Sequence, residues 1–132
     1  YYKEIIKFID YNFGNNEVII FFNLSNSYLI NLYKKAKLYI FSSYCEVFGL
    51  TSLEAMSQNC PVILSNKSSL KEINSNAADY FDPDDEIQIK ENINRLLEDN
   101  DYRENLIKRG KNHYKKFSWE KTVHETLEVL GI

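Results

Sequence analysis

Residues 38–64 read LYIFSSYCEVFGLTSLEAMSQNCPVIL, and the fold class is predicted from the pattern of this segment. It begins and ends with short apolar runs, 38–41 and 61–64, each of strand length. Between them lies a loop that ends at Gly49, followed by a predicted helix over 50–58 that Asn59-Cys60-Pro61 terminates. Proline is tolerated at the first position of a strand, so Pro61 can open the second run. Strand, helix and strand in this order predict a βαβ unit on a parallel sheet.

The same alternation continues on both sides of this stretch. Strands are predicted over residues 17–22, 38–41, 61–64 and 78–81. The run EVIIFF at 17–22 is continuously apolar after its first residue, which is typical of a strand covered on both faces. Helices are predicted over residues 2–11, from the N-cap Ser25 to the lysines near 37, over 50–58, 70–73, 82–99 and 102–114, and from the N-cap Ser118 to 130. A turn is predicted at Phe13-Gly14-Asn15-Asn16. The fold class is therefore α/β: a Rossmann-like parallel sheet with flanking helices.

Particular side chains are assigned to the core and to the helix ends. In the helix after Asp82-Pro83-Asp84-Asp85, an aspartate is expected as the cap and Pro83 at the first helical position. The apolar positions of that helix are expected to be buried: Ile87, Ile89, Ile93, Leu96 and Leu97.

Length, charge and cysteine content limit the function classes. The chain has 132 residues, 44% of them hydrophobic, which suits one domain over 1–132. Lysine and arginine number 16 against 19 acidic residues, so the net charge of −3 gives no basis for nucleic-acid binding. The sequence contains neither an apolar run of about 18 residues nor a signal-peptide pattern. Two cysteines make neither a disulfide framework nor a metal set, so we expect a cytoplasmic protein.

Parallel sheets bind ligands at the carboxyl ends of their strands, which directs attention to the loops at 23–25, 42–51, 65–69 and 82–85. The loop at 42–51 contains the most residues that could contact a ligand. Gly49, immediately before the helix, permits a positive φ and a close approach of ligand to backbone. The free amides at 50–52 lie at the positive end of the helix dipole, with the Thr51 and Ser52 hydroxyls beside them. This group of amides and hydroxyls at the start of the helix, called the mouth below, is a candidate site for a phosphate or pyrophosphate.

Two carboxylates flank this mouth. Glu46 lies in the loop, and Glu54 lies one turn into the helix, where side chains lean back toward the N-terminus. Carboxylates repel phosphate but accept hydrogen bonds from hydroxyls such as a ribose diol. A sugar, a ribose and a pyrophosphate in one cleft would be a nucleotide sugar. Acidic residues make up about one in seven of the chain, so two glutamates eight residues apart do not by themselves identify a site. The hypothesis of a ligand site rests mainly on the position of this loop after a predicted parallel strand.

Residues 46–56, EVFGLTSLEAM, resemble the E-x7-E motif of retaining glycosyltransferases of family 4, which have the GT-B fold. Segments on either side resemble the same family in the same order: 32–36, 61–63, 77–84 and 117–120. The resemblance covers about 17–130 and implies the C-terminal, donor-binding half of such an enzyme. That family transfers a sugar from a nucleotide diphosphate to an acceptor hydroxyl with retention at the anomeric carbon.

The resemblance also implies roles for single residues. Glu46 would be the catalytic residue that contacts the donor sugar, and Glu54 would bind the ribose hydroxyls. The remaining donor-binding positions would be Ser42, Ser43, Phe48, Gly49, Leu50 and Thr51. The family generally uses no metal and no cofactor, because protein donors stabilise the leaving diphosphate. The expected partners are a UDP-, GDP- or ADP-linked sugar and an acceptor glycan or lipid-linked saccharide.

The sequence departs from the family pattern in several places. Val47 and Asn59 stand where the family usually has Gly, as does Phe22, and Thr51 stands where it usually has Pro. No positions match the family's earlier loop with an Arg and a Lys, or its N-terminal domain. We therefore expect a domain truncated at its N-terminal side, with little or no turnover as an isolated chain. The alternative is a non-catalytic remnant, or a subunit that docks a separate N-terminal half in a split enzyme.

Other residues have simpler interpretations. The acidic cluster Asp79, Asp82, Asp84 and Asp85 suits the start of a helix better than a magnesium site. His113 and His124 are expected on exposed helix faces without a catalytic role. A carboxylate next to Cys45 makes a poor setting for a nucleophilic thiol.

Two further features leave alternatives open. The basic stretch at 108–116 is expected to be a solvated face, with peripheral contact to an anionic inner membrane surface as an alternative. The stripe of Trp119, Val123 and Leu127 is expected to pack in a core or domain interface and to be partly exposed here. A phospho-receiver domain has this length and alternation, but the strands end at Asn23, Ser42 and Ser65 where it would need acidic residues.

Overall fold

The computed structural model of the protein describes residues 2–14 and 17–132. Asn15 and Asn16 of the predicted turn lie outside the described residues. Three strands form a parallel sheet in the order β1-β2-β3: β1 (Tyr39–Phe41), β2 (Val62–Ser65) and β3 (Asp79–Phe81). Ile63, at the centre of β2, pairs with Ile40 on one side and Asp79 on the other. The predicted fold class, a parallel sheet with flanking helices, is confirmed.

Seven α-helices are found in the described ranges. They are α1 (Tyr2–Asn12), α2 (Asn26–Lys35), α3 (Leu50–Ser57), α4 (Leu70–Asn74), α5 (Glu86–Glu98), α6 (Asn100–His113) and α7 (Trp119–Leu130). Short 3₁₀ turns follow α4 (Ser75–Ala77) and α6 (Tyr114–Lys116). The two serine caps are confirmed, since Ser25 Oγ accepts from the Tyr28 amide and Ser118 Oγ accepts from the Lys121 amide.

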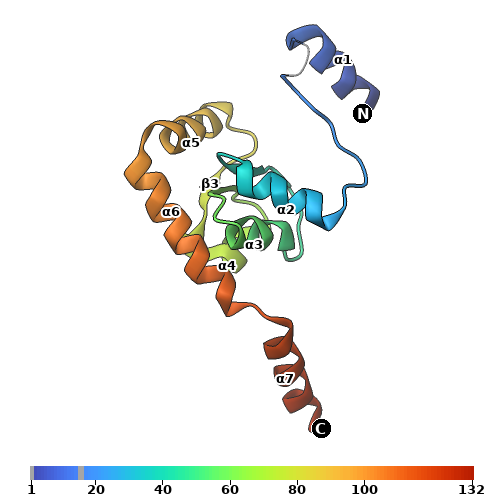
Figure 1. The fold of residues 1–132 in the computed structure, drawn as a ribbon, viewed down its shortest axis with the longest axis vertical. Coiled ribbons are helices and arrows are strands. Elements are labelled where there is room, and N and C mark those ends of the chain that lie inside the picture. Colours follow the sequence, from blue (N-terminus) through green and yellow to red (C-terminus); the bar gives the residue numbers. More distant parts are fainter. Residues whose placement is uncertain (1, 15–16) are drawn as a thin grey trace.

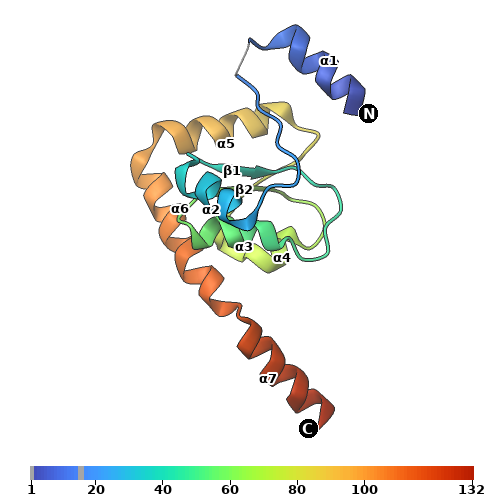
Figure 2. The same ribbon diagram turned by 45° about the vertical axis from the view of Figure 1, so that its right-hand side comes forward.

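The alternation of side chains along β2 divides the core in two. Val62 and Leu64 pack with residues of α2, α3 and α4, whereas Ile63 packs with Leu96 of α5 and Leu106 of α6. Figure 2 shows the sheet between α5 on one side and α2, α3 and α4 on the other. All four β2 side chains are fully buried, which explains the continuous apolar run at 61–64.

A buried polar cluster fixes β3 to the helices that follow it. Asp79 is 8% exposed; its Oδ2 accepts from Arg95 of α5 at 2.8 Å, and its Oδ1 accepts from the Tyr102 hydroxyl of α6 at 2.6 Å. The Arg95 guanidinium also lies over the Tyr102 ring, 4.4 Å from its centroid. The carboxylate is thus paired and hydrogen-bonded, as a buried charge must be.

The predicted strand at 17–22 is wrong. These residues follow an irregular path and pair with no strand in the described part of the chain. The side chains of Val18–Phe22 are exposed, by 37% to 64%. A strand exists only when a neighbouring strand completes its hydrogen bonds, and an apolar run cannot supply that partner by itself.

The start of α5 also differs from the prediction. The helix begins at Glu86 and is capped by Asp85, whose Oδ1 accepts from the Gln88 amide at 3.0 Å. Pro83 lies before the helix, in a turn closed by a hydrogen bond from the Asp85 amide to Asp82 O. The predicted burial of Ile87 and Leu97 is wrong, since they are 72% and 41% exposed. Ile87 lies about 200° around the helix from the inward-facing Ile89 and so faces away from the core.

The first and last helices stand apart from this body. Neither α1 nor α7 contains a buried residue, although both are amphipathic. Figure 1 shows α1 beyond an extended connection and α7 projecting from the far end of α6. The stripe of Trp119, Val123 and Leu127 is therefore exposed along its length.

Candidate functional site

Hydrogen bonds connect the three loops that follow the carboxyl ends of β1, β2 and β3. Ser68 Oγ and Ser69 Oγ, after β2, both donate to Glu46 O, at 2.6 and 2.7 Å, and Ser69 Oγ also lies 2.7 Å from Val47 O. Lys67 Nζ donates to Asp82 Oδ2, after β3, at 2.9 Å. The Tyr44 hydroxyl donates to Asp84. Residues from three separate loops are therefore in contact at the carboxyl end of the sheet.

The Lys67–Asp82 pair has an electrostatic signature. The hydrogen bond from Lys67, together with one from the Asp84 amide, lowers the pKa of the Asp82 carboxyl below its ordinary value. The cluster of four aspartates is thereby accounted for, because Asp79 holds α5 and α6, Asp82 pairs with Lys67, Asp84 accepts from Tyr44 and Asp85 caps α5. In residues 2–14 and 17–132, no group of three His, Cys, Asp or Glu side chains is arranged to hold a metal ion.

Gly49 adopts the conformation that the sequence predicts. Its φ of 75° is in the left-handed region, and a Cβ at this position would lie 2.7 Å from Leu70 Cδ2. Ser52 Oγ lies 2.7 Å from Gly49 O and 2.8 Å from Asn74 Oδ1, so this serine connects the Gly49 turn to the end of α4. Leu50 and Thr51 begin α3, where amides have no acceptor within the helix. An open helix N-terminus thus lies where the carboxyl ends of the strands meet, which is the end of a parallel sheet that generally binds ligands.

Glu46 lies directly against this turn. Its backbone amide donates to Ser68 Oγ at 3.2 Å, and its own Oε1 accepts from the Val47 amide at 3.1 Å. Its Cγ lies 3.5 Å from the point that a Cβ on Gly49 would occupy. The carboxylate is therefore held beside the start of α3 by a braced loop.

Glu54 faces the neighbouring helix. It lines a small recess together with Tyr33 and other residues of α2, a recess that includes neither Glu46 nor Gly49. Tyr33 is buried, and its pKa is raised by burial and by the nearby Tyr39 and Glu54. The two glutamates share one neighbour, Tyr39, whose pKa is raised by burial and by both carboxylates, while its hydrogen bond to Thr51 works in the opposite direction. Both carboxylates therefore act electrostatically on Tyr39.

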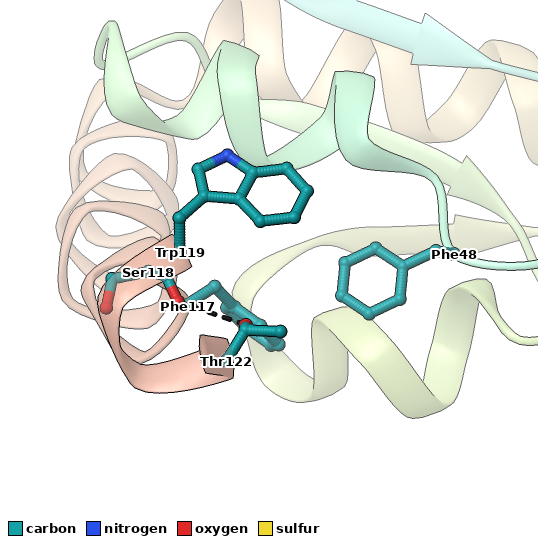
Figure 3. A pocket seen from close by; sticks show the side chains of 5 residues that line it. All are labelled: Phe48, Phe117, Ser118, Trp119 and Thr122. Atoms are coloured by element: carbon teal, nitrogen blue, oxygen red, sulfur yellow. Dashed lines mark hydrogen bonds between the residues drawn. The ribbon is translucent and has the colours of Figure 1, made fainter. Parts of the chain in front are cut away.

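The side chains of the other candidate residues do not converge on one point. Ser42 is exposed at the end of β1, and Ser43 Oγ donates to Cys45 O within the loop. Leu50 is exposed, and Thr51 Oγ1 accepts a hydrogen bond from Tyr39 at 2.9 Å. The Phe48 ring points away from the turn and meets Phe117 edge to face, at 5.8 Å between centroids. Figure 3 shows Phe48, Phe117 and Trp119 around one hollow at the start of α7.

The sequence did not identify the residues that brace this site. Ser68 and Ser69 lie in a loop that topology had marked, but their role is to hold the Glu46 loop, and Ser68 adopts a positive φ of 56°. Tyr39 lies in the apolar run at 38–41 and Tyr33 in the helix predicted from Ser25, and neither pattern predicts a polar role for them. Their rings meet edge to face at 5.5 Å, and a period-2 or period-3.6 pattern does not show where a phenol hydroxyl points.

The predicted exposure of one histidine is wrong. His113 is buried, not exposed as expected, and its Nε2 lies 2.7 Å from Ile73 O, so the ring donates to that carbonyl. It also contacts the Phe117 ring. A buried, hydrogen-bonded histidine of this kind links α6 to α4. His124 is exposed on α7, as expected. Both cysteines are free, with Cys45 exposed and Cys60 buried.

Comparison with known proteins gives a consistent family. Residues 1–113 match the family described as "Glycosyl transferases group 1". The chain is 40% identical over 101 residues to O-antigen chain mannosyltransferase B of Escherichia coli, which covers 76% of this chain and 26% of that protein. It is 29% identical over 134 residues to an uncharacterized glycosyltransferase of Methanocaldococcus jannaschii, covering 98% of this chain and 34% of that protein. The chain therefore spans about a quarter to a third of the length of these relatives.

Solved structures agree at the level of the fold. Sucrose-phosphate synthase from Thermosynechococcus elongatus superimposes with a TM-score of 0.85 at 26% identity, over 97% of this chain and 33% of that one. The C-terminal domain of a group 1 glycosyl transferase from Francisella tularensis superimposes with a TM-score of 0.73 at 23% identity, over 87% of this chain and 60% of that one. No helix among the described residues is both long and apolar enough to cross a membrane.

Proposed function

Because the chain belongs to the group 1 glycosyltransferases, we propose that it holds a nucleotide-diphospho-sugar for transfer to an acceptor hydroxyl. The observation that carries this proposal is the open N-terminus of α3 at Gly49, at the carboxyl edge of a parallel sheet, with Glu46 against it. In such sheets this edge is where ligands bind, and helix N-termini favour phosphate oxygens.

The proposed arrangement assigns each part of the donor to a part of the site. The diphosphate lies against the amides of Leu50 and Thr51, where backbone donors stabilise the charge that develops as it leaves. Glu46 accepts hydrogen bonds from hydroxyls of the sugar, and Glu54 accepts them from the ribose. The acceptor oxygen then bonds to the anomeric carbon while the bond from that carbon to the diphosphate oxygen breaks, and the proton of the acceptor hydroxyl passes to the departing diphosphate oxygen. Ser42, Ser43 and the Phe48 backbone line the same edge.

The finer assignment follows the E-x7-E resemblance. We propose membership of family 4, retention of the anomeric configuration, and transfer without a metal or cofactor. Relatives named as mannosyltransferases favour a hexose donor. The acceptor is a glycan or a lipid-linked saccharide, and an N-terminal domain of the kind that the E-x7-E resemblance implies takes part in the transfer. We place the protein in the cytoplasm or at the inner membrane surface.

Ligand-observed NMR with UDP-, GDP- and ADP-sugars tests this function. One nucleotide is expected to bind, and Glu54→Ala is expected to weaken its binding about tenfold or more, since hydrogen bonds to a charged acceptor are lost. Glu98→Ala is the matched control, because this exposed glutamate ends α5 on the other face of the sheet.

The role of Glu46 has a sharper test. Glu46→Gln should weaken binding of the nucleotide sugar but leave binding of the same nucleotide diphosphate without its sugar unchanged. Equal losses for both ligands would contradict the assignment to the sugar. Failure of every nucleotide to bind the unmodified chain would contradict the donor-binding function and favour a subunit that only docks a partner.

A further inference from the structure

We propose that Tyr39 is a positioning residue, which donates a hydrogen bond to Thr51 Oγ1 and so directs the Thr51 hydroxyl hydrogen toward a diphosphate oxygen at the start of α3. The inference rests on the proposed donor site and adds to it a residue that the E-x7-E motif does not contain. Thr51 would then act on the ligand as a hydrogen-bond donor only.

The geometry of the pair is well defined. The Tyr39 hydroxyl lies 2.9 Å from Thr51 Oγ1 and donates to it, joining β1 to the second residue of α3. The Tyr39 ring is fixed by Tyr33 at 5.5 Å, edge to face, and by Phe41 at 6.2 Å, stacked. Thr51 is half-buried, at the second position of α3, next to the Leu50 and Thr51 amides at the start of the helix.

The chemistry of a hydroxyl gives this contact a direction. A threonine hydroxyl has one hydrogen and two lone pairs. When Tyr39 occupies a lone pair, the threonine hydrogen is left to find another acceptor, and accepting one bond strengthens the next in the chain. The neighbouring Leu50 and Thr51 amides attract the same kind of acceptor, an anionic oxygen.

The surroundings of Tyr39 keep it a donor. Burial, Glu54 and Glu46 all raise its pKa, which outweighs the opposing effect of its bond to Thr51. The phenol therefore keeps its proton at neutral pH. The hydroxyl is bonded to Thr51 and not to either carboxylate.

Isothermal titration separates ligand positioning from a purely structural role. The probes are UDP, GDP and ADP, with uridine, guanosine and adenosine as the matching nucleosides without phosphate. Tyr39→Phe removes only the hydroxyl, and Thr51→Val removes the acceptor at nearly constant shape. Each is expected to weaken binding of the diphosphate about two- to tenfold and to leave nucleoside binding unchanged.

Two further variants complete the design. The double variant Tyr39→Phe/Thr51→Val should bind no more weakly than Thr51→Val alone, because the tyrosine acts through the threonine. Thr51→Ser should retain binding. Tyr80→Phe is the matched control: it removes a hydroxyl that donates to Ser75 O at 2.6 Å, and it should lower Tm without changing affinity.

Each failure has a separate meaning. If the unmodified chain binds a diphosphate but Tyr39→Phe binds it equally well, the positioning role is overturned and the donor site stands. The same holds if diphosphate and nucleoside affinities fall together, or if the two single losses add. If no diphosphate binds the unmodified chain, the donor site itself is overturned, and the role of Tyr39 with it.

Discussion

Among single residues, Gly49 has the tightest constraint at the candidate site. Two separate features exclude a side chain there: the left-handed φ of 75° and the Leu70 methyl that a Cβ would meet at 2.7 Å. The second feature also explains why Leu70 is completely buried, since it fills the space under the turn. The backbone at the start of α3 is therefore shaped by the loop and by α4 together.

Gly49→Ala should destabilise the protein by about 2–4 kcal/mol, combining the left-handed penalty with overpacking against Leu70. Urea denaturation measures the change. The same substitution in a Leu70→Ala background is the matched control, because it keeps the left-handed φ at residue 49 and removes the methyl that the Cβ meets. If Gly49→Ala costs as much in that background, the contact with Leu70 has no energetic weight.

The site residues illustrate what a linear sequence can specify. The glycine conformation and the position of Glu46 follow from local order along one loop, and the sequence predicts both. The contact of Tyr39 with Thr51 depends on how β1 meets α3, which is a three-dimensional relation between residues 12 apart. His113 has the same explanation, because its burial is set by Ile73, 40 residues earlier.

Among the structural elements, the connection of β3 to α5 and α6 has the clearest polar basis. Asp79 accepts hydrogen bonds from one residue of each helix, and Arg95 stacks on Tyr102 between them. Arg95 is partly exposed, so its contribution is screened by solvent. The Tyr102 hydroxyl is the better-defined partner.

Tyr102→Phe should cost about 1–2 kcal/mol of stability, because a hydrogen bond to a buried carboxylate is lost. Burial and the bond to Asp79 raise the pKa of Tyr102, so this contribution is complete below the ordinary tyrosine pKa of about 10 and is lost as pH rises through the raised value. Chemical denaturation at several pH values measures it, with the exposed Tyr28→Phe as control. A cost that persists unchanged in strong alkali would exclude this origin.

Most elements follow from apolar periodicity and capping residues. The three strands and the helices α1 to α7 lie within a few residues of their predicted bounds, because each has a local signal. The run at 17–22 has the same local signal as β2, yet β2 lies between two strands, whereas the run lies beside no strand of the residues that the structure describes. Propensity predicts an extended backbone; only tertiary contacts decide whether it becomes part of a sheet.

For the whole molecule, stability is concentrated in the body from α2 to α6. Every fully buried side chain of the described residues belongs to that body, and α1 and α7 add none. Short helices without tertiary packing are marginal in water, whatever their amphipathic pattern. The two terminal helices therefore have little to stabilise them within this chain.

Hydrogen exchange should reveal this division. Amides of β2 are expected to exchange most slowly, at rates set by global unfolding, and amides of α1 and α7 much faster, by local opening. Mass spectrometry of peptic fragments, or NMR, gives the rates. Strong protection of α7 would instead mean that its apolar stripe is covered in solution, for example by a second copy of the chain.

The exposed run from Val18 to Phe22 has a consequence for the colloidal behaviour of the chain. It presents five consecutive apolar residues, without proline, glycine or charge, in a backbone whose hydrogen-bonding groups pair with no strand of the described chain. A segment with this composition is a template for intermolecular cross-β stacking. Solubility at high concentration is then governed by one short adhesive segment more than by the net charge of the molecule.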